Sequence, residues 1–175
     1  TDACPTGMGG FLTIDGHVKE YFTIPIDERD QRTLSTTAGS CDGQQVREAS
    51  AALFALRCWP RWWAVDRVQL AVRVDNMTTI SLLSKLKISG RALRVIAREW
   101  AMDLADATYE PDIIEHTPGV QNKVADALSR HIGAEETALP AILRGATKVH
   151  PPVRDQTWWR ALSPPEKVKG ALVIY

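Results

Sequence analysis

The sequence predicts an α/β fold. Three observations favour this class. Residues from Val68 to Asp75 alternate apolar and polar, as in a half-buried strand, whereas residues from Arg91 to Ala107 carry apolar side chains at helical spacing. Two further β-rich runs, Phe11–Ile14 and Val18–Ile26, precede them. Strands and helices that follow one another along a chain indicate an α/β protein.

The first two β-rich runs predict an antiparallel hairpin. Asp15-Gly16 separates them, and glycine accepts the positive φ that a tight type I′ turn requires. Pro25 lacks the N–H that a sheet ladder needs, so the second strand is expected at a sheet edge. The polar, turn-rich residues from Asp27 to Gly43 predict a loop.

The next elements alternate between helix and strand. Asp42 is positioned to cap a helix that ends near Trp59, with a buried stripe of Val46, Ala49, Leu53 and Leu56. After the strand 68–75, the pattern predicts helices over 76–86 and 91–107, a strand over 111–116 and a helix over 121–131. The order implies a right-handed parallel crossover, in which ligands gather at the carboxyl ends of strands.

The remaining residues, 132–175, predict a proline-rich C-terminal linker or tail outside a domain of residues 1–131. They hold a short helical pattern from Leu139 to Ala146 in an otherwise extended segment. Trp158 and Trp159 are the residues there that could dock on the domain or on a neighbour.

Composition narrows the class of protein. A chain of 175 residues with 45% hydrophobic content suits one globular domain, and no apolar run approaches the roughly 18 residues of a membrane helix. We therefore expect an intracellular protein with no membrane partner. Cys4, Cys41 and Cys58 form no Cys-x-x-Cys pair and leave an odd cysteine, which argues against a zinc cage and a disulfide framework.

Four acids carry the functional hypothesis: Asp2, Glu48, Asp75 and Asp126. Asp2 opens a glycine-rich run, Glu48 lies on the predicted helix, Asp75 ends the alternating strand and Asp126 lies in Ala125-Asp126-Ala127-Leu128-Ser129-Arg130. Four clustered carboxylates repel one another unless divalent cations neutralise them. Such a set indicates a two-metal phosphodiester-cleaving site.

These four segments, in this order, resemble ribonuclease H, specifically the ribonuclease H domain that follows reverse transcriptase in retroelements. The resemblance covers about residues 1–131 and is strongest in the stretch from His116 to Arg130. It implies a ribonuclease H-like mixed five-stranded sheet with helices on both faces, whose first strand runs up to Asp2. Because only Thr1 precedes Asp2, we expect that strand to be largely truncated.

The resemblance implies an endonuclease that hydrolyses the RNA strand of RNA/DNA hybrids and leaves 5′-phosphate and 3′-hydroxyl ends. Asp2, Glu48, Asp75 and Asp126 would bind two Mg²⁺ ions, with Mn²⁺ as a substitute. The reverse transcriptase domain of the same polyprotein would be a partner, in the cytoplasm or in retroelement particles. No Gly-x-Ser-x-Gly elbow supports a serine nucleophile.

Substrate contacts are expected on two surfaces. Gln44 and Gln45 precede Glu48 on one helix face, and with Asn76 and Met77 they resemble the family's minor-groove contacts. For these residues, helix capping or core packing is an equally good interpretation. A second surface is a basic stripe at helical spacing, which could follow a phosphate backbone or be an ordinary solvated face: Arg91, Arg94 and Arg98.

His116 has two interpretations. It lies ten residues before Asp126, where the family places a mobile histidine that assists catalysis, yet its His-x-Pro-Gly context also resembles a histidine that ends the last strand. A lone histidine is more often structural.

Two other functions fit the same motifs. One is a catalytically silent ribonuclease H-like module that binds nucleic acid or tethers a polymerase; the retention of all four acids favours the enzyme over it. The other is a metal nuclease of the same fold that acts on DNA, such as an integrase or resolvase. The amides at 44 and 45 and the 125–130 motif count against this one.

Overall fold

A computed structural model of the chain describes residues 1–37, 39–63, 68–86, 88–106, 109–118, 122–132, 139–155 and 157–162. Helices, strands and short 3₁₀ helices (η) follow in the order β1 (Asp2–Ala3), β2 (Gly7–Ile14), β3 (His17–Pro25), α1 (Glu28–Leu34), α2 (Gln44–Cys58), η1 (Pro60–Trp62), β4 (Val68–Val74), α3 (Met77–Lys85), α4 (Arg91–Asp106), β5 (Tyr109–His116), α5 (Lys123–Arg130), η3 (Ala141–Leu143), β6 (Thr147–Lys148) and η4 (Arg160–Leu162). The α/β class is confirmed.

The strands form two sheets rather than the single five-stranded sheet expected. One has the order β1-β2-β3-β6, and the other pairs β4 with β5 in parallel. β1 is only two residues long, and the Thr1 nitrogen donates a hydrogen bond of 3.0 Å to the Arg73 carbonyl of β4. The two sheets are therefore linked beside β1 by a hydrogen bond from Thr1.

The expected hairpin is confirmed. β2 pairs antiparallel with β3, and Asp15 and Gly16 take φ values of 51° and 76° in the turn between them. β3 was expected at the sheet edge, but the short strand β6 pairs with it in parallel at Glu20 and Tyr21. A two-residue strand leaves no alternating pattern in a sequence, which is why β6 could not be predicted.

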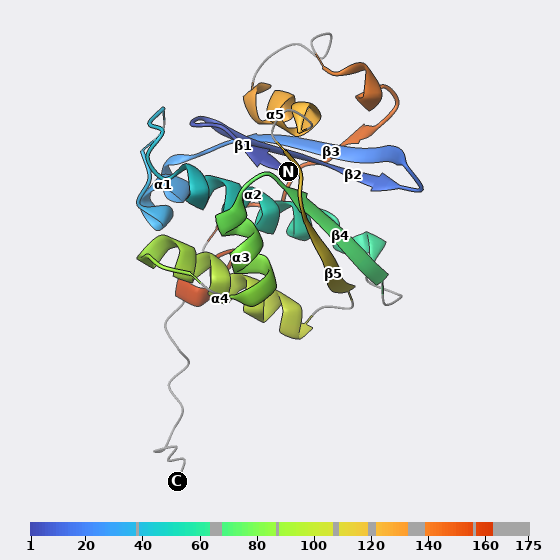
Figure 1. Ribbon diagram of the computed structural model, residues 1–175. Helices are drawn as coiled ribbons and strands as arrows, with labels where there is room; N and C mark the ends of the chain where they lie inside the picture. Colours follow the sequence, from blue (N-terminus) through green and yellow to red (C-terminus); the bar gives the residue numbers. More distant parts are fainter. Residues whose placement is uncertain are drawn as a thin grey trace.

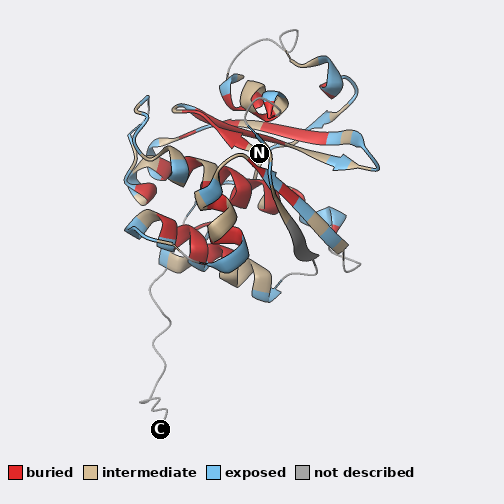
Figure 2. Ribbon diagram, in the orientation of Figure 1, coloured by how far each residue is buried: buried red, intermediate tan, exposed pale blue. Residues whose placement is uncertain are grey.

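Helices cover both faces of the β1–β3 layer (Figure 1). α5 lies on one face and α2 on the other, with α3 and α4 beyond α2. A Cβ at Gly9 would lie 2.5 Å from the Leu128 Cβ of α5, so only glycine allows this close approach. Figure 2 shows the buried residues on the inner sides of α2 and α4 and along β2 and β3.

Two local expectations were wrong. The segment 27–43 contains helix α1, because Asp27 and Asp30 form a reciprocal capping box and Leu34 is buried. Asp42 does not cap α2: the N-cap is Gly43, at φ 80°, and no side chain bonds there. The polar character of the segment concealed a helix stabilised mainly by its cap.

The described part of the tail packs against residues 1–131 instead of extending away from them. Trp158 and Trp159 are buried in the main core, and Leu143 joins a second cluster with Tyr21 and Leu128. Arg154 forms ion pairs with Asp27 and Asp30 of the α1 cap. The described tail therefore contacts the rest of the chain both near its start, at Leu143, and near its end, from Arg154 to Trp159.

Candidate active site

Asp2 lies in β1, between the helices that cover the two faces of the sheet. It is buried, and its Oδ2 accepts a hydrogen bond of 3.1 Å from Ser129 Oγ of α5. Burial, together with the charges of Asp75 and Asp126, raises the pKa of Asp2 above its ordinary value. A buried carboxylate near other negative charges is stabilised when it binds a proton or a cation.

Glu48 approaches the same point from α2. Gln44, one turn earlier, donates from Nε2 to Glu48 Oε1 at 3.1 Å and also to the Ala3 carbonyl of β1. Burial is the main cause that raises the pKa of Glu48 to about 7, and the charges of Asp75 and Asp2 add to it. Gln44 thus ties the helix that carries Glu48 to the strand that carries Asp2.

Asp75 follows the last residue of β4 and is half-buried. The next residue, Asn76, caps α3 by accepting from the backbone nitrogens of Thr78 and Thr79. His116 ends β5 beside it, and its Nε2 lies 3.1 Å from the Asp75 carbonyl oxygen. A strand end and a helix start therefore fix the position of Asp75 from both sides.

Asp126 lies in the first turn of α5 and is half-buried. Its Oδ1 accepts from Arg130 Nε at 2.8 Å, an ion pair between neighbouring turns of the same helix. Ser129 lies three residues after Asp126 and binds Asp2 from the same helix. α5 therefore contributes one acid and the anchor for another.

Asp2 is electrostatically coupled to each of the other three acids, and Glu48 is also coupled to Asp75. The pKa of Asp2 responds to Asp75 and Asp126, and that of Glu48 responds to Asp75 and Asp2. Among the described residues, however, no three acidic, histidine or cysteine side chains already surround one point closely enough to hold an ion. Asp2 is the acid whose electrostatic interactions include all three of the others.

The carboxylates nevertheless suit divalent cations. Glu48 Oε2 is buried and has no hydrogen-bond partner of normal length among the residues that the structure describes, although the nearby Asn76 side chain lowers the pKa of this acid. An acid oxygen in that state costs free energy unless it binds a proton or a cation. Carboxylate oxygens are the ligands that Mg²⁺ prefers in proteins. Asp2, Glu48, Asp75 and Asp126 therefore have the right chemistry for a metal site.

The predicted substrate residues divide between the site and the surface. Gln44 is committed to Glu48 and Ala3, and Asn76 to the α3 cap. Gln45 is exposed, as is Met77 at 62% of its surface. The basic stripe on α4 is also exposed, and none of its three arginines forms an ion pair with another described residue: Arg91, Arg94 and Arg98.

One residue that holds an acid in place was not predicted from the sequence. Ser129 is fully buried against Asp2, and its signal was the spacing of three from Asp126, which puts both on one side of α5.

No protein-family model, curated protein or solved structure was found to match the chain. None of its described helices has the length and apolar character needed to cross a membrane.

The raised pKa of Glu48 predicts a pH-dependent stability. The folded chain holds this proton up to about pH 7 and the unfolded chain only to about pH 4.5, so folding is coupled to proton uptake between those values. Stability is therefore lost as pH rises through that range. In EDTA, Glu48→Gln should melt with a smaller decline in Tm from pH 5 to pH 8. Parallel Tm curves for the two proteins would contradict the assignment.

Proposed function

We propose that the chain is a metal-dependent endonuclease that hydrolyses the RNA strand of RNA/DNA hybrids. The observation that carries the proposal is the electrostatic coupling of the buried Asp2 of β1 to three acids from other elements: Glu48 of α2, Asp75 after β4 and Asp126 of α5. The proposal includes a ribonuclease H-like arrangement of these elements and a role in retroelement reverse transcription. It also includes a reverse transcriptase domain of the same polyprotein as the partner.

In this proposal the four acids hold the cations, and neighbouring residues hold the acids. Two divalent cations in such a site supply an acidified water and a counter-charge for the leaving oxygen. Asp2 is oriented by Ser129 and Glu48 by Gln44, so neither carboxylate has to be ordered when substrate arrives. Burial, and to a lesser degree the charges of neighbouring acids, raises the pKa values of Asp2 and Glu48, and a bound cation would offset both causes.

His116 has a supporting rather than a chemical role in this proposal. Its ring contacts the backbone of Asp75, and it is exposed beside the site. It can thus position the end of β4 and still move when substrate is bound. This geometry agrees with its interpretation as the histidine that ends the last strand.

A hybrid would be bound by the exposed residues around the acids. Gln45 and Met77 offer one polar and one apolar contact to a minor groove, in which 2′-hydroxyls distinguish RNA from DNA. The arginine stripe of α4 offers positive charge for the backbone. Gln44 and Asn76 support the acids and the α3 cap instead, so their substrate roles would require these bonds to break.

The experiment that tests the proposal is a cleavage assay of the 175-residue chain on end-labelled RNA/DNA hybrid, duplex DNA and duplex RNA. We expect cleavage of the RNA strand of the hybrid in Mg²⁺ or Mn²⁺ and none in EDTA. Cleavage of duplex DNA would favour the DNA nuclease. Binding of hybrid without cleavage would favour the silent module.

The stripe on α4 gives a separate prediction. Changing Arg91, Arg94 and Arg98 together to glutamine should weaken hybrid binding and lower the slope of log K against log salt by about 2–3, since each lost phosphate contact removes about 0.7–0.9. Cleavage at saturating hybrid should change little. Binding titrations at several salt concentrations provide the measurement.

The matched control removes three exposed charges elsewhere, by changing Lys19, Arg32 and Arg144 to glutamine. Its salt slope should stay closer to that of the unchanged chain. Equal slopes for the two triple variants would show that the α4 stripe has no particular contact with the backbone.

A further inference from the structure

A second polar cluster, which shares no residue with the four acids, lies where β3 meets η1. Glu20 of β3 is buried, with 6% of its side chain exposed, and both of its carboxylate oxygens accept hydrogen bonds. Oε1 accepts from the Arg61 guanidinium, and Oε2 accepts from the Trp62 indole nitrogen at 3.2 Å. One buried carboxylate therefore holds two neighbouring side chains of the same short helix.

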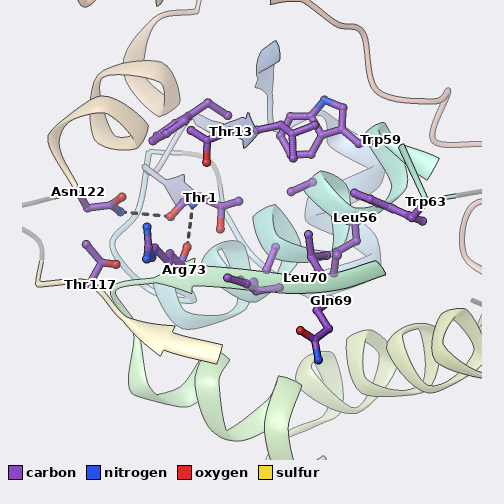
Figure 3. Close-up of a pocket in the computed structure, with 16 residues that line it drawn as sticks. Thr1, Thr13, Leu56, Trp59, Trp63, Gln69, Leu70, Arg73, Thr117 and Asn122 are labelled. Atoms are coloured by element: carbon purple, nitrogen blue, oxygen red, sulfur yellow. Dashed lines mark hydrogen bonds between the residues drawn. The ribbon is translucent and has the colours of Figure 1, made fainter. Parts of the chain in front are cut away.

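Trp62 differs from the two tryptophans that lie near it in the chain. Trp59 and Trp63 are buried, and they line the pocket between the two sheets (Figure 3). Trp62 does not line that pocket and is 41% exposed. Because its N–H edge is turned toward the buried Glu20, the exposed part is mainly the carbon surface of the ring. A flat aromatic surface is therefore presented to solvent.

The hydrogen bond from Trp62 to Glu20 fixes the orientation of this exposed ring. An exposed indole can donate to water instead, so folding does not require a buried carboxylate as the acceptor. Burying a carboxylate costs free energy even when it is paired. An aromatic ring that is already ordered, however, loses little conformational entropy when it binds a partner. The arrangement is typical of an aromatic residue that anchors a ligand.

Arg61 supplies hydrogen-bond donors beside the ring. Its side chain is 61% exposed, and its bond to Glu20 uses one terminal nitrogen of the guanidinium. A guanidinium has five N–H donors in a planar fork that suits phosphate oxygens. The donors that face solvent can therefore bind an anion while the bond to Glu20 keeps the fork in place.

The charges of the neighbouring segments favour an anionic partner. The described residues of β3, η1 and the segment 139–150 include a single acid, Glu20, which is paired with Arg61. Thr147 of β6 lies opposite Glu20 in the sheet, and the next residue, Lys148, is exposed. A nucleic-acid strand offers both a negative backbone and flat bases, so it matches the charge and the ring together. An acidic protein surface would match the charge alone.

We propose that Trp62 and Arg61 bind one nucleotide of a single-stranded nucleic acid. The base stacks on the indole, Arg61 donates to the phosphate, and Glu20 is a positioning residue that touches neither. Every base has a π face, so the site tolerates different sequences. Bases within a duplex already stack on both neighbours, which is why the site selects an unpaired strand. The proposal does not rest on the proposed function, because it involves none of the four acids.

The test measures binding of the 175-residue chain in EDTA to two end-labelled strands, a 15-nucleotide oligothymidylate and an abasic strand of the same length and charge. Trp62→Ala should weaken binding of oligothymidylate by at least about fivefold, the lower end of base–aromatic stacking, and that of the abasic strand by less than about twofold. Trp62→Phe should stay within about threefold of the unchanged chain, because the smaller ring still stacks. Leu162→Ala is the matched control, since it removes a 50% exposed apolar side chain from another 3₁₀ helix, and it should alter neither affinity.

Two further variants separate the roles of the cluster. Arg61→Gln should weaken binding of both strands, because both carry phosphates. Glu20→Gln replaces two acceptor oxygens by one acceptor and one donor, so it cannot hold both neighbours. It should weaken binding of oligothymidylate, and this effect should largely disappear when Trp62→Ala is already present. A merely structural role for Glu20 would leave its effect unchanged in that background.

Four results would overturn the proposal. One is equal affinity of Trp62→Ala and Leu162→Ala for oligothymidylate, and another is an equal loss for the abasic strand, which would indicate charge without stacking. A third is binding of thymidine monophosphate as tight as that of the strand, which would indicate a site for free nucleotides. The last is a dimer in solution that Trp62→Ala dissociates, because the ring would then belong to a contact between two copies. All four readouts are independent of nuclease activity.

Discussion

The Asp75→Asn variant is expected to lose at least about 100-fold in cleavage of the RNA strand of a hybrid, with no loss of folded stability. Outer residues that only orient metal ligands are worth about 10–100-fold, so removal of a ligand should cost at least as much. The Tm in EDTA should stay level or rise, because Asp75 contributes to the repulsion felt by Asp2 and Glu48. Initial rates on labelled hybrid and melting curves measure the two effects.

Asp15→Asn is the matched control, because Asp15 is exposed in the β2–β3 turn at a φ that asparagine accepts readily. It should cut hybrid at the rate of the unchanged chain. If Asp75→Asn kept a rate within about twofold of that value, the four acids would not form the active site. If the Tm in EDTA fell markedly together with the rate, the loss of activity would instead indicate a structural role for Asp75.

Elements with a sustained pattern were predictable from the sequence. β4 and α4 repeat an apolar residue at a fixed period over several turns or pleats, and the structure contains both. α1 was missed because its stability comes from the Asp27–Asp30 capping box and one buried apolar residue, Leu34, which give no period. Cap bonds and packing decide such short helices, and neither is visible as a repeat.

The four acids could be selected from the sequence, but the residues that support them only in part. Asp2, Glu48, Asp75 and Asp126 lie in motifs with a recognisable order; the structure couples Asp2 electrostatically to the other three, and their role as an active site stays a prediction. Gln44 was expected to contact substrate, whereas it binds Glu48 and the β1 backbone. An amide can serve either partner with the same atoms, so its role depends on tertiary contacts that spacing alone does not fix.

The tail illustrates a different limit. Its prolines prevent long regular elements, and that part of the prediction agrees with the short 3₁₀ turns at 141–143 and 160–162. Absence of regular structure did not mean absence of packing. Trp158 is 6% exposed and stacks on Phe54 at 4.8 Å between ring centroids. Arg57 lies over the same indole, 4.7 Å from its centroid.

Charged groups reinforce this contact between the tail and the helices. Arg57 donates to the Trp158 carbonyl at 2.7 Å and pairs with the buried Glu99 and with Asp103 of α4. Arg160 pairs with Asp103 and Asp106, and the Ala161 nitrogen donates to Glu99 at 2.6 Å. Loss of the tail would leave Glu99 with fewer partners in a buried position, which is costly.

Trp158→Ala should therefore destabilise the whole chain, by about 3–5 kcal/mol as for other buried tryptophans, and lower the Tm by roughly 10 °C. The indole fills the space between Phe54 and Arg57, and alanine would leave a cavity there together with an uncovered cation. Val153→Ala is the control in the same segment, since Val153 is 80% exposed and its loss should move the Tm by no more than about 2 °C. Calorimetry gives the Tm of both variants and of the unchanged chain for this comparison. If Trp158→Ala melted within about 2 °C of Val153→Ala, the tail would behave as the linker expected from the sequence, and its packing would contribute nothing to the cooperative unit.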